Sequence, residues 1–552
     1  MSLLNKASIV TTPTSYENGK ILSVKPSIVL GNELITNGNF SDGANNWLLT
    51  GSSFWVNSSI EVPTGGLTQL LTLENNKTYK ITFDVIQGSG INGGVYVNTN
   101  YNSPVFADNV GITTTGVGGT YTFTFTMNGI GNGITLTRRV NNQDIRIDNV
   151  SVKEAIDADF DFTRNSSATR VNSQGLIEDI TSNLPRIDYT GGEGHWLFEP
   201  QSTQTATYSN DFTQGDLFNS SQDPALLDTV LTSQQATSPD GTNNAWKLVD
   251  NNDGLTGQAS LSYFSTTVIA NNYNTISYFV KKQGSNNFVY IDTFGFDAGA
   301  NGRTWFDIQN GTLGNVSANH TANIQNYGNG WYRISITIQA VTDTVGGFSL
   351  RLATSNGAGN VLRDGTNGVY LFGVQAESDA SHQFMTSYIP TNGSNVTRLA
   401  DAAYGAGSSD LINSTEGVLY AEAAKLNDNS LDYKAIGFNN GSQQERLVFI
   451  FGTGGEKIRF QVRTNNVIVF QDDFNVTSLS QQNKIAVRYS NTTGYAFFIN
   501  GLKVGVNSSL IVPQITRLGF GVSGANFFGK TKCVAVFKEA LTDDELTCLT
   551  TI

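Results

Sequence analysis

The sequence predicts an all-β protein, and three features of its composition support this. Charged residues make up only 14 % of the 552 residues, below the usual quarter, so the Glu- and Lys-rich faces of long exposed helices are missing. Gly is abundant, with 57 residues, as many short turns require. Phe (32 residues) and Tyr (20 residues) are also plentiful, and aromatic side chains suit half-buried pleated strands.

We expect three antiparallel β-sandwiches in series, of the jelly-roll or lectin-like kind, with two irregular segments. The clearest strands alternate polar and apolar residues, as in "KTYKITFDVI" (77–86), "NTISYFVKKQ" (274–283) and "KIRFQVRT" (457–464). The predicted parts are an N-terminal anchor (1–30), a first sandwich (31–154), a connector (155–205), a second sandwich (206–396) and a third sandwich (397–552).

Different sequence signals predict the two irregular segments and the single helix. Pro13 and Pro26 break the extended N-terminal anchor, and Gly and Pro cluster in the connector, where periodicity weakens. The one predicted helix is "TDDELTCLTT" (542–551), in which Thr542 can cap the first turn. Three acidic residues follow the cap, where negative charge opposes the helix dipole.

Charge and hydropathy exclude two classes of partner. The net charge is −13 and no basic stripe is present, so we expect no nucleic-acid binding. No apolar run reaches the ~18–20 residues of a membrane span, and the N-terminus does not read as a secretory signal. We expect Cys533 and Cys548 to be reduced, with a single bridge between them as the alternative.

Motifs for cofactors and catalysis fail on inspection. Gly88, Gly90 and Gly93 form a G-x-G-x-x-G that leads into another strand rather than the helix a dinucleotide site needs. The aspartates from Asp157 lack the Gly and Glu of a calcium loop. The histidines form no zinc pair, and neither a nucleophile elbow nor an E-x-D-x-E run occurs. We therefore expect a non-enzymatic protein without a cofactor, structural calcium aside.

Residues 33 to 154 resemble a carbohydrate-binding jelly roll of the cellulose- and xylan-binding type. The resemblance rests on the opening "ELITNGNFSDGANNW" and the closing "IRIDNVSVKE". It implies a structural calcium held by Asp148, with Glu33 or Asn39 as a partner. The alternative for Asp148 is an ordinary surface aspartate at a strand end.

Aromatic residues of this first sandwich are candidates for stacking against sugar rings. The alternative is that they fill the core, as aromatic residues in sandwiches usually do. The candidate glycan-binding residues are Trp47, Phe54, Trp55, Tyr96 and Tyr101.

The remaining chain resembles virion appendage proteins of tailed bacteriophages, notably of crAss-like and related phages of Bacteroidetes. The phrases that carry the resemblance are "DFTRNSSATRVNSQGLIE", "LPRIDY", "LFEPQSTQTATYSNDF", "NGWYRISITI", "VYLFGVQAE" and "TSYIPTNGSNVTRLAD". The lead "LLNKASIVTTPTSYENGK" fits the same group, with residues 31–154 inserted behind it. The last sandwich is similar to laminin-G and concanavalin A-like domains, on "IAVRYSNTTGYAFFINGLKVG" and "VAVFKEALTDDEL".

The connector carries the charges that we expect to order an oligomer. Arg164 and Arg170 can pair with Asp159, Asp161 or Glu178, across a turn or across subunits, because bidentate arginine pairs fix register. The alternative is a surface linker whose charges lie in water.

These observations predict a structural protein of a phage virion, assembled in the cytoplasm of the host bacterium. It would be a head or tail fibre or decoration, most simply a homotrimer, held to other virion proteins through residues 1–30 and 155–205. Its sandwiches would bind host-surface or mucus glycans, with repetition compensating for weak sites. Two alternatives stay open: a purely structural component without a ligand, and a capsule depolymerase.

Overall fold

The protein is described by a computed structural model, and the chain divides into two compact units. One unit comprises residues 25–157, and the other comprises residues 1–24 together with 158–552. The structure describes residues 3–26, 29–74, 77–88, 95–99, 111–112, 119–127, 131–138, 145–156, 158–214, 228–268, 270–284, 286–297, 299, 301–342, 344–380, 383–427, 434–452, 454–522 and 525–552.

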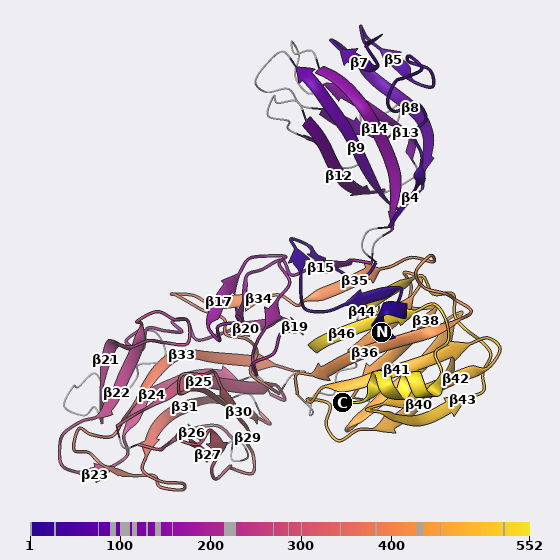
Figure 1. The fold of residues 1–552 in the computed structure, drawn as a ribbon. Coiled ribbons are helices and arrows are strands. Elements are labelled where there is room, and N and C mark those ends of the chain that lie inside the picture. Colours follow the sequence, from indigo (N-terminus) through magenta and orange to yellow (C-terminus); the bar gives the residue numbers. More distant parts are fainter. Residues whose placement is uncertain are drawn as a thin grey trace. The chain divides into compact units, whose positions relative to one another are not determined.

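The smaller unit consists of two antiparallel sheets that share one apolar core (Figure 1). The first sheet has the order β11-β10-β13-β8-β5, at Gly111–Ile112, Val95–Asn98, Gly131–Arg138, Gly66–Leu73 and Leu48–Thr50. The second has the order β12-β9-β14-β7-β6, at Gly119–Thr126, Thr78–Gly88, Ile145–Ile156, Ser59–Val62 and Phe54–Val56, and β4 (Val29–Glu33) pairs with β14. Strand β6 is therefore at an edge of its sheet.

The larger unit contains a second pair of sheets with its own core. One sheet has the order β21-β22-β33-β25-β30-β29, at Thr229–Ala236, Ala245–Asp250, Gly368–Asp379, Tyr273–Gln283, Trp331–Gln339 and Thr321–Asn326. The other has the order β24-β31-β26-β27-β28, at Ser260–Val268, Thr344–Ala353, Phe288–Phe294, Gly302–Asp307 and Thr312–Leu313. A short ladder, β23 (Thr256–Gly257) with β32 (Val361–Leu362), lies beside them.

A third pair of sheets contains most of the C-terminal residues. One sheet has the order β18-β19-β46-β36-β41-β42-β43, at Ile187–Asp188, His195–Phe198, Gly529–Phe537, Glu416–Lys425, Asn483–Ser490, Gly494–Ile499 and Leu502–Asn507, and β1 (Ile9–Thr11) pairs with β46. The other has the order β2-β3-β15-β35-β44-β37-β38-β39-β40, at Tyr16–Glu17, Lys20–Ile21, Phe160–Thr163, Ala402–Ala406, Arg517–Val522, Lys434–Asn439, Arg446–Phe451, Lys457–Thr464 and Val467–Asn475, and β45 (Ala525–Asn526) pairs with β44. The rings of Phe460 on β39 and Phe497 on β42 pack against each other between the two sheets, with their centroids 4.5 Å apart and their planes tilted by 35°.

The N-terminal lead and the connector are more regular than the sequence indicated. Besides the strands that they add to the third pair of sheets, they form β16 (Ala168–Val171) with β17 (Ile177–Ile180), and β20 (Ser202–Gln204) with β34 (Val396–Arg398). The chain leaves the larger unit after Val24 and re-enters it at Ala158, and β3 pairs with β15 across that gap. Their short strands escaped prediction because two to four residues show no period.

The all-β antiparallel fold is confirmed, and so is the terminal helix. Helix α1 (Asp543–Thr550) has Thr542 as its N-cap in a capping box with Glu545, and a short 3₁₀ helix, η1, spans Leu3–Lys6. The division into three sandwich domains with the boundaries given above stays a prediction. Both cysteines are free, and burial raises the pKa of Cys533 to about 12. No helix among the described residues is long and apolar enough to cross a membrane.

One sheet of the larger unit has a polar face, and this face positions the candidate site. Alternate residues of a strand point to opposite sides, so β30 sends Ile334 and Ile336 into the core and Arg333 and Ser335 to the other side. Residues 384–391 cover that side: Arg333 and Gln375 both donate to Thr386. Polar side chains on this face are buried, and their hydrogen bonds must be satisfied within the protein.

Candidate functional site

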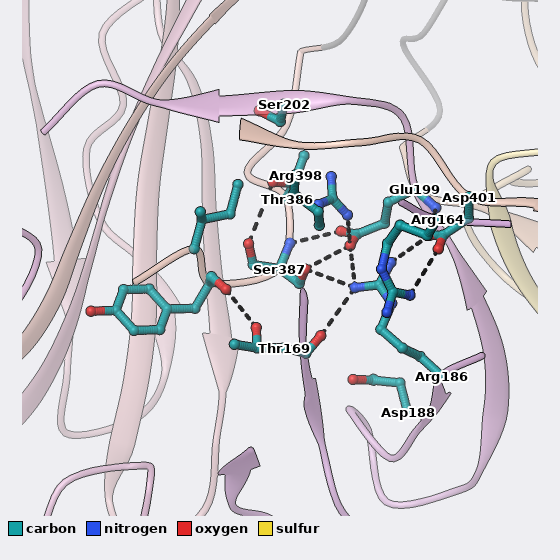
Figure 2. Close-up of polar contacts among 12 residues, drawn as sticks. Arg164, Thr169, Arg186, Asp188, Glu199, Ser202, Thr386, Ser387, Arg398 and Asp401 are labelled. Atoms are coloured by element: carbon teal, nitrogen blue, oxygen red, sulfur yellow. Dashed lines mark hydrogen bonds and ion pairs between the residues drawn. The ribbon is translucent and has the colours of Figure 1, made fainter. Parts of the chain in front are cut away.

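A buried cluster of charges joins the connector to the segment after β33. We call it the ion network, and its members are Arg164, Arg186, Glu199, Arg398 and Asp401. Each of the five is at most 3 % exposed. Figure 2 shows the guanidinium of Arg186 between the carboxyl groups of Glu199 and Asp401. Three positive and two negative side chains thus share one dry site.

Asp401 is bound on both carboxylate oxygens. Its Oδ1 accepts a hydrogen bond from Arg164 Nη1 at 3.1 Å, and its Oδ2 accepts one from Arg186 Nη2 at 2.5 Å. The backbone N–H of Glu199 also donates to Oδ2, at 2.8 Å. In return, the backbone N–H of Asp401 donates to the Glu199 carbonyl at 3.0 Å. The segment before β35 is therefore tied to the strand end after β19 by charge and by backbone.

Glu199 is the second carboxylate of the ion network. It accepts hydrogen bonds from Arg186 Nη1 at 2.7 Å, from Arg398 Nη1, and from the backbone N–H (2.7 Å) and Oγ (2.6 Å) of Ser387. Burial by itself would raise the pKa of Glu199, but Arg398 and Arg186 outweigh it and hold that pKa far below its usual range. The carboxyl group stays ionised and is no proton donor at neutral pH.

The arginines of the ion network remain charged as well. Burial lowers the pKa of Arg164 to about 10, against the opposing charge of Asp401, which still leaves the group protonated at neutral pH. Arg186 also donates to the Thr169 carbonyl at 3.0 Å and to Ser387 Oγ at 2.9 Å. The network therefore has no free base or nucleophile, and its chemistry is that of a structural tie.

A second layer of hydrogen bonds surrounds this tie. Thr169 Oγ1 donates to the Tyr388 carbonyl at 2.5 Å, and Tyr388 Oη donates to Ser209 at 2.7 Å. Buried Glu377 accepts from Ser202 Oγ at 2.6 Å and from the Thr386 backbone N–H at 3.1 Å. The phrase "TSY" at 386–388 is thereby held on both sides, by the connector and by β33.

The prediction for Arg164 needs correction, whereas Arg170 has a partner that the sequence suggested. Arg164 pairs with Asp401 of its own chain, and its side chain is fully buried, so it is not available to a neighbouring subunit. Arg170 pairs with Glu178 at 2.7 Å across the β16–β17 hairpin, and its Nη1 donates to Tyr16 Oη at 3.0 Å. Both arginines thus have a carboxylate partner within their own chain.

Asp159 and Asp161 are the two connector aspartates expected to pair with arginines across a turn or across subunits, and they differ in their surroundings. Asp159 accepts a hydrogen bond from the backbone N–H of Ser23 at 2.7 Å and so joins the lead to the connector. Asp161 is exposed on β15. The inter-subunit role assigned to these residues stays a prediction for Asp161. Asp157 lies outside the described residues.

The candidate glycan-binding aromatics differ in exposure. Trp47 is only 6 % exposed and packs on Phe40 with ring centroids 5.3 Å apart, so it fills the core rather than offering a face to a ligand. Phe54 and Trp55, on edge strand β6, are 46 % and 45 % exposed. Trp55 Nε1 donates to the Phe40 carbonyl at 3.0 Å, which fixes the indole. The Tyr96 side chain and the whole of Tyr101 lie outside the described residues.

The proposed calcium ligands each have protein partners. Glu33 accepts from the backbone N–H of Ile35 (3.0 Å) and Val152 (2.9 Å) and from Ser151 Oγ (2.6 Å). Asn39 accepts from Ser41. Burial raises the pKa of Asp148, which accepts from the Asn149 N–H at 2.7 Å. Within the described ranges, no three His, Cys, Asp or Glu residues are placed to hold a metal ion.

A pocket of about 230 Å³ lies beside the ion network in the larger unit. Its walls come from β16, β18–β19, β29–β30, β46 and the segment 384–388. The charged residues on its walls are Arg170, Asp188, Glu199, Arg333 and Lys530. A second hollow of about 400 Å³ shares Val171, Thr190 and Tyr327 with it.

A buried histidine lies near this pocket. His195 Nε2 is 3.4 Å from Asp188 Oδ1, but burial lowers the pKa of His195 to about 4, so the ring is neutral at pH 7 and the contact is no ion pair there. Asp188 accepts instead from the backbone N–H groups of Val171 (2.8 Å) and Thr190 (2.9 Å). Nearby Lys530 also disfavours the charged imidazole.

Sequence reasoning missed Arg186, Glu199, Arg333, Arg398 and Asp401 as site residues. A usable signal existed, since Glu199 stands in the apolar phrase "WLFEP" and Arg333 in "NGWYRISITI". A charged residue among apolar ones is rarely buried without polar partners, so each of these positions marks a buried charge with such partners.

Comparisons with known proteins assign no family. No known protein family and no curated protein matches the sequence. A CBM40 of Ruminococcus gnavus IT-sialidase matches at 14 % identity, 27 % of this chain, 93 % of that chain and a TM-score of 0.23. A CBM22 tandem of Paenibacillus barcinonensis Xyn10C matches at 11 % identity, 64 % of this chain, 99 % of that chain and a TM-score of 0.20. A SAP-like pentraxin of Limulus polyphemus matches at 12 % identity, 25 % of this chain, 70 % of that chain and a TM-score of 0.20. Likenesses this weak assign no ligand.

Proposed function

We propose that this chain is a non-enzymatic, glycan-binding structural protein of a tailed-phage virion, a fibre or decoration of head or tail. In this proposal the smaller unit binds sugars through Trp55 and Phe54. The larger unit provides a rigid base and the contacts to other virion proteins, most simply in a homotrimer. Assembly takes place in the host bacterial cytoplasm.

The observation that carries the glycan-binding part is the fixed, exposed indole of Trp55. Its N–H is already bonded to the Phe40 carbonyl, so the ring loses little freedom when a ligand binds. The electron-rich face of an indole attracts the slightly positive C–H groups on one face of a sugar ring. Phe54, the preceding residue of β6, is equally exposed and points to the opposite side of the strand, so it offers a second apolar face at the same edge.

The phage part is supported by what the shared phrases do in this fold. The residues of "DFTR", "LPR", "LFEP" and "TRLAD" include all five members of the ion network. A buried network of this kind fixes the geometry between a connector and the sheets it joins. A virion component needs such fixed geometry, and the network leaves no ionisable pair free for acid–base chemistry.

The test is binding of a glycan array by the full chain and by Trp55→Ala. We expect the wild-type protein to bind at least one neutral glycan and Trp55→Ala to lose about 5- to 150-fold in affinity, since stacking on an aromatic ring is worth about 1–3 kcal/mol. Trp55→Phe keeps a ring but loses the hydrogen bond, so an intermediate affinity is expected. Thermal midpoints should hardly change, because the indole is half exposed.

Two variants serve as controls. Leu70→Ala removes an apolar side chain that is 57 % exposed on the other sheet of the same unit and should leave binding unchanged. Trp47→Ala removes a core ring and should destabilise the unit by about 3–5 kcal/mol. If the wild-type protein is silent across a broad array, the purely structural alternative is favoured. Release of reducing ends from host capsule would establish the depolymerase instead.

A further inference from the structure

Two positive side chains on the walls of the 230 Å³ pocket have no negative partner among the residues that the structure describes. These are Arg333 on β30 and Lys530 on β46. Unmatched cations at a concave site attract anions, and their attraction is strongest where water is excluded. The pocket therefore differs from the ion network beside it, where every arginine faces a carboxylate.

Arg333 is 1 % exposed, yet its hydrogen bonds go to neutral groups. Nη1 donates to the Thr386 carbonyl at 2.7 Å and Nη2 donates to Ser277 Oγ at 3.0 Å. The guanidinium carbon lies 5.0 Å from the ring centroid of Phe279, and Nε has no hydrogen-bond partner in the described part of the chain. The Nε of Arg186 and of Arg398 likewise has no partner among the described residues, so the feature that sets Arg333 apart is that its guanidinium meets no carboxylate there. Burying a charge without a counter-charge is costly.

Lys530 is half-buried at the same pocket. Among the described residues, its ammonium group forms no ion pair, whereas Lys532, two residues along β46, pairs with Glu193. The positive charge of Lys530 is felt locally, since it lowers the pKa of His195. Arg333 and Lys530 are therefore two cationic side chains at one pocket that form no ion pair among the described residues.

The other charged residues on the pocket walls are satisfied within the protein. Arg170 is paired with Glu178, and the Glu199 carboxylate is held by the ion network. Asp188 accepts from two backbone N–H groups. A surplus of positive charge therefore remains on the walls.

The rest of the lining suits a sugar ring rather than a bare ion. Asn323 and Gln325 bring amide groups, and Tyr327 and Phe384 bring aromatic rings. The volume lies below the ~300–1,000 Å³ typical of drug-sized ligands, so the occupant is small. The second hollow shares wall residues with the first and so lies directly beside it.

We propose that this pocket binds the carboxylate of an acidic sugar, with Arg333 and Lys530 as the cationic contacts. A guanidinium edge and an ammonium group on one carboxylate match the usual geometry of charge-assisted hydrogen bonds. The site lies in the larger unit and does not depend on Trp55, so it adds an acidic-glycan specificity to the chain. The two binding proposals can therefore be tested separately, and a negative result for one does not decide the other.

The test is isothermal titration of the full chain with D-glucuronate, methyl β-D-glucoside and inorganic phosphate. We expect D-glucuronate to bind and the neutral glucoside and phosphate to bind at least about tenfold more weakly, since a hydrogen bond to a charged group is worth about 1.5–3 kcal/mol. Lys530→Ala should weaken D-glucuronate binding by at least about tenfold. Lys532→Ala removes the same charge from the same strand outside the pocket and should change little.

Arg333→Lys and Arg333→Met complete the series, with thermal midpoints as the check on folding. Arg333→Lys should retain part of the D-glucuronate affinity and Arg333→Met none. If either Arg333 variant fails to fold, the comparison of Lys530→Ala with Lys532→Ala still tests the proposal. Absence of D-glucuronate binding, equal binding of the glucoside or phosphate, or equal effects of Lys530→Ala and Lys532→Ala would each overturn the proposal.

Discussion

Two neighbouring sites in the larger unit bury arginine, and they treat its charge in opposite ways. In the ion network three arginines share the carboxylates of Glu199 and Asp401. At the pocket, Arg333 is equally buried and meets a carbonyl, a hydroxyl and an aromatic face instead. The two sites meet at one dipeptide, since Thr386 accepts a hydrogen bond from Arg333 and the next residue, Ser387, donates one to Glu199. The comparison shows that the charges of the ion network are neutralised within the fold, whereas the charge of Arg333 meets only neutral groups there, which is the basis of the proposal that it binds an anionic ligand.

The largest effect expected from breaking this contrast is at Asp401. Asp401→Asn leaves Arg164 and Arg186 buried with less negative charge than they need, and removal of one member of a buried ion pair typically costs about 3–5 kcal/mol. We expect the midpoint of urea unfolding to fall accordingly.

Asp473→Asn is the matched control for that experiment. Asp473 pairs with Arg459 at 2.6 Å on the partly exposed strands β39 and β40, where an ion pair is worth about 0–1 kcal/mol. Equal losses of stability in the two variants would contradict the view that the ion network holds the fold together.

A second effect concerns the pH dependence of stability through His195. The pKa of His195 is about 4 in the fold and 6.5 when unperturbed, so the unfolded chain takes up a proton below about pH 6.5 that the folded chain does not. The contribution is fully present above pH 6.5 and is lost as the pH falls toward 4. At about 1.4 kcal/mol per pKa unit, the loss is up to about 3 kcal/mol.

Urea unfolding between pH 4.5 and 7 measures this slope, and His195→Gln should flatten it. Carboxylates such as Glu199, whose ordinary pKa is 4.5, also contribute to the slope at the acidic end of this window, so the difference between the wild-type protein and His195→Gln isolates the imidazole. An unchanged slope in His195→Gln would show that the buried imidazole is not its source.

A smaller effect is expected when the unmatched arginine is removed. Arg333→Met removes the shorter of the two hydrogen bonds that the Thr386 carbonyl accepts and leaves no carboxylate without a partner, so a cost of about 1–3 kcal/mol is expected. Arg186→Met deprives both Glu199 and Asp401 of a partner and should cost more. Thermal or urea midpoints of the two variants, measured side by side, check the order, and the reverse order would contradict the contrast.

Sequence periodicity was enough for the fold but not for the site. Alternating strands and the cap at Thr542 predicted the β architecture and helix α1, because both signals are local. The Arg170–Glu178 pair was among the pairings considered, since the residues are eight apart on one hairpin. Arg164 and Asp401 are 237 residues apart, and no local pattern joins them.

The exposure of the aromatic side chains could not be predicted from the sequence either. Trp47 and Trp55 stand eight positions apart in similar surroundings, yet the first is in the core and the second is half exposed. Edge position and the bond from Trp55 to the Phe40 carbonyl decide this, and both depend on which strands pair.

A crystal structure of the full chain soaked with D-glucuronate tests the central claim most directly. We predict density for the sugar in the pocket beside Thr386, with its carboxylate within hydrogen-bond distance of Arg333 and Lys530 and the ion network unchanged. A pocket without the sugar, or a sugar whose carboxylate points away from both cations, would contradict the claim that the unmatched arginine is kept for a ligand.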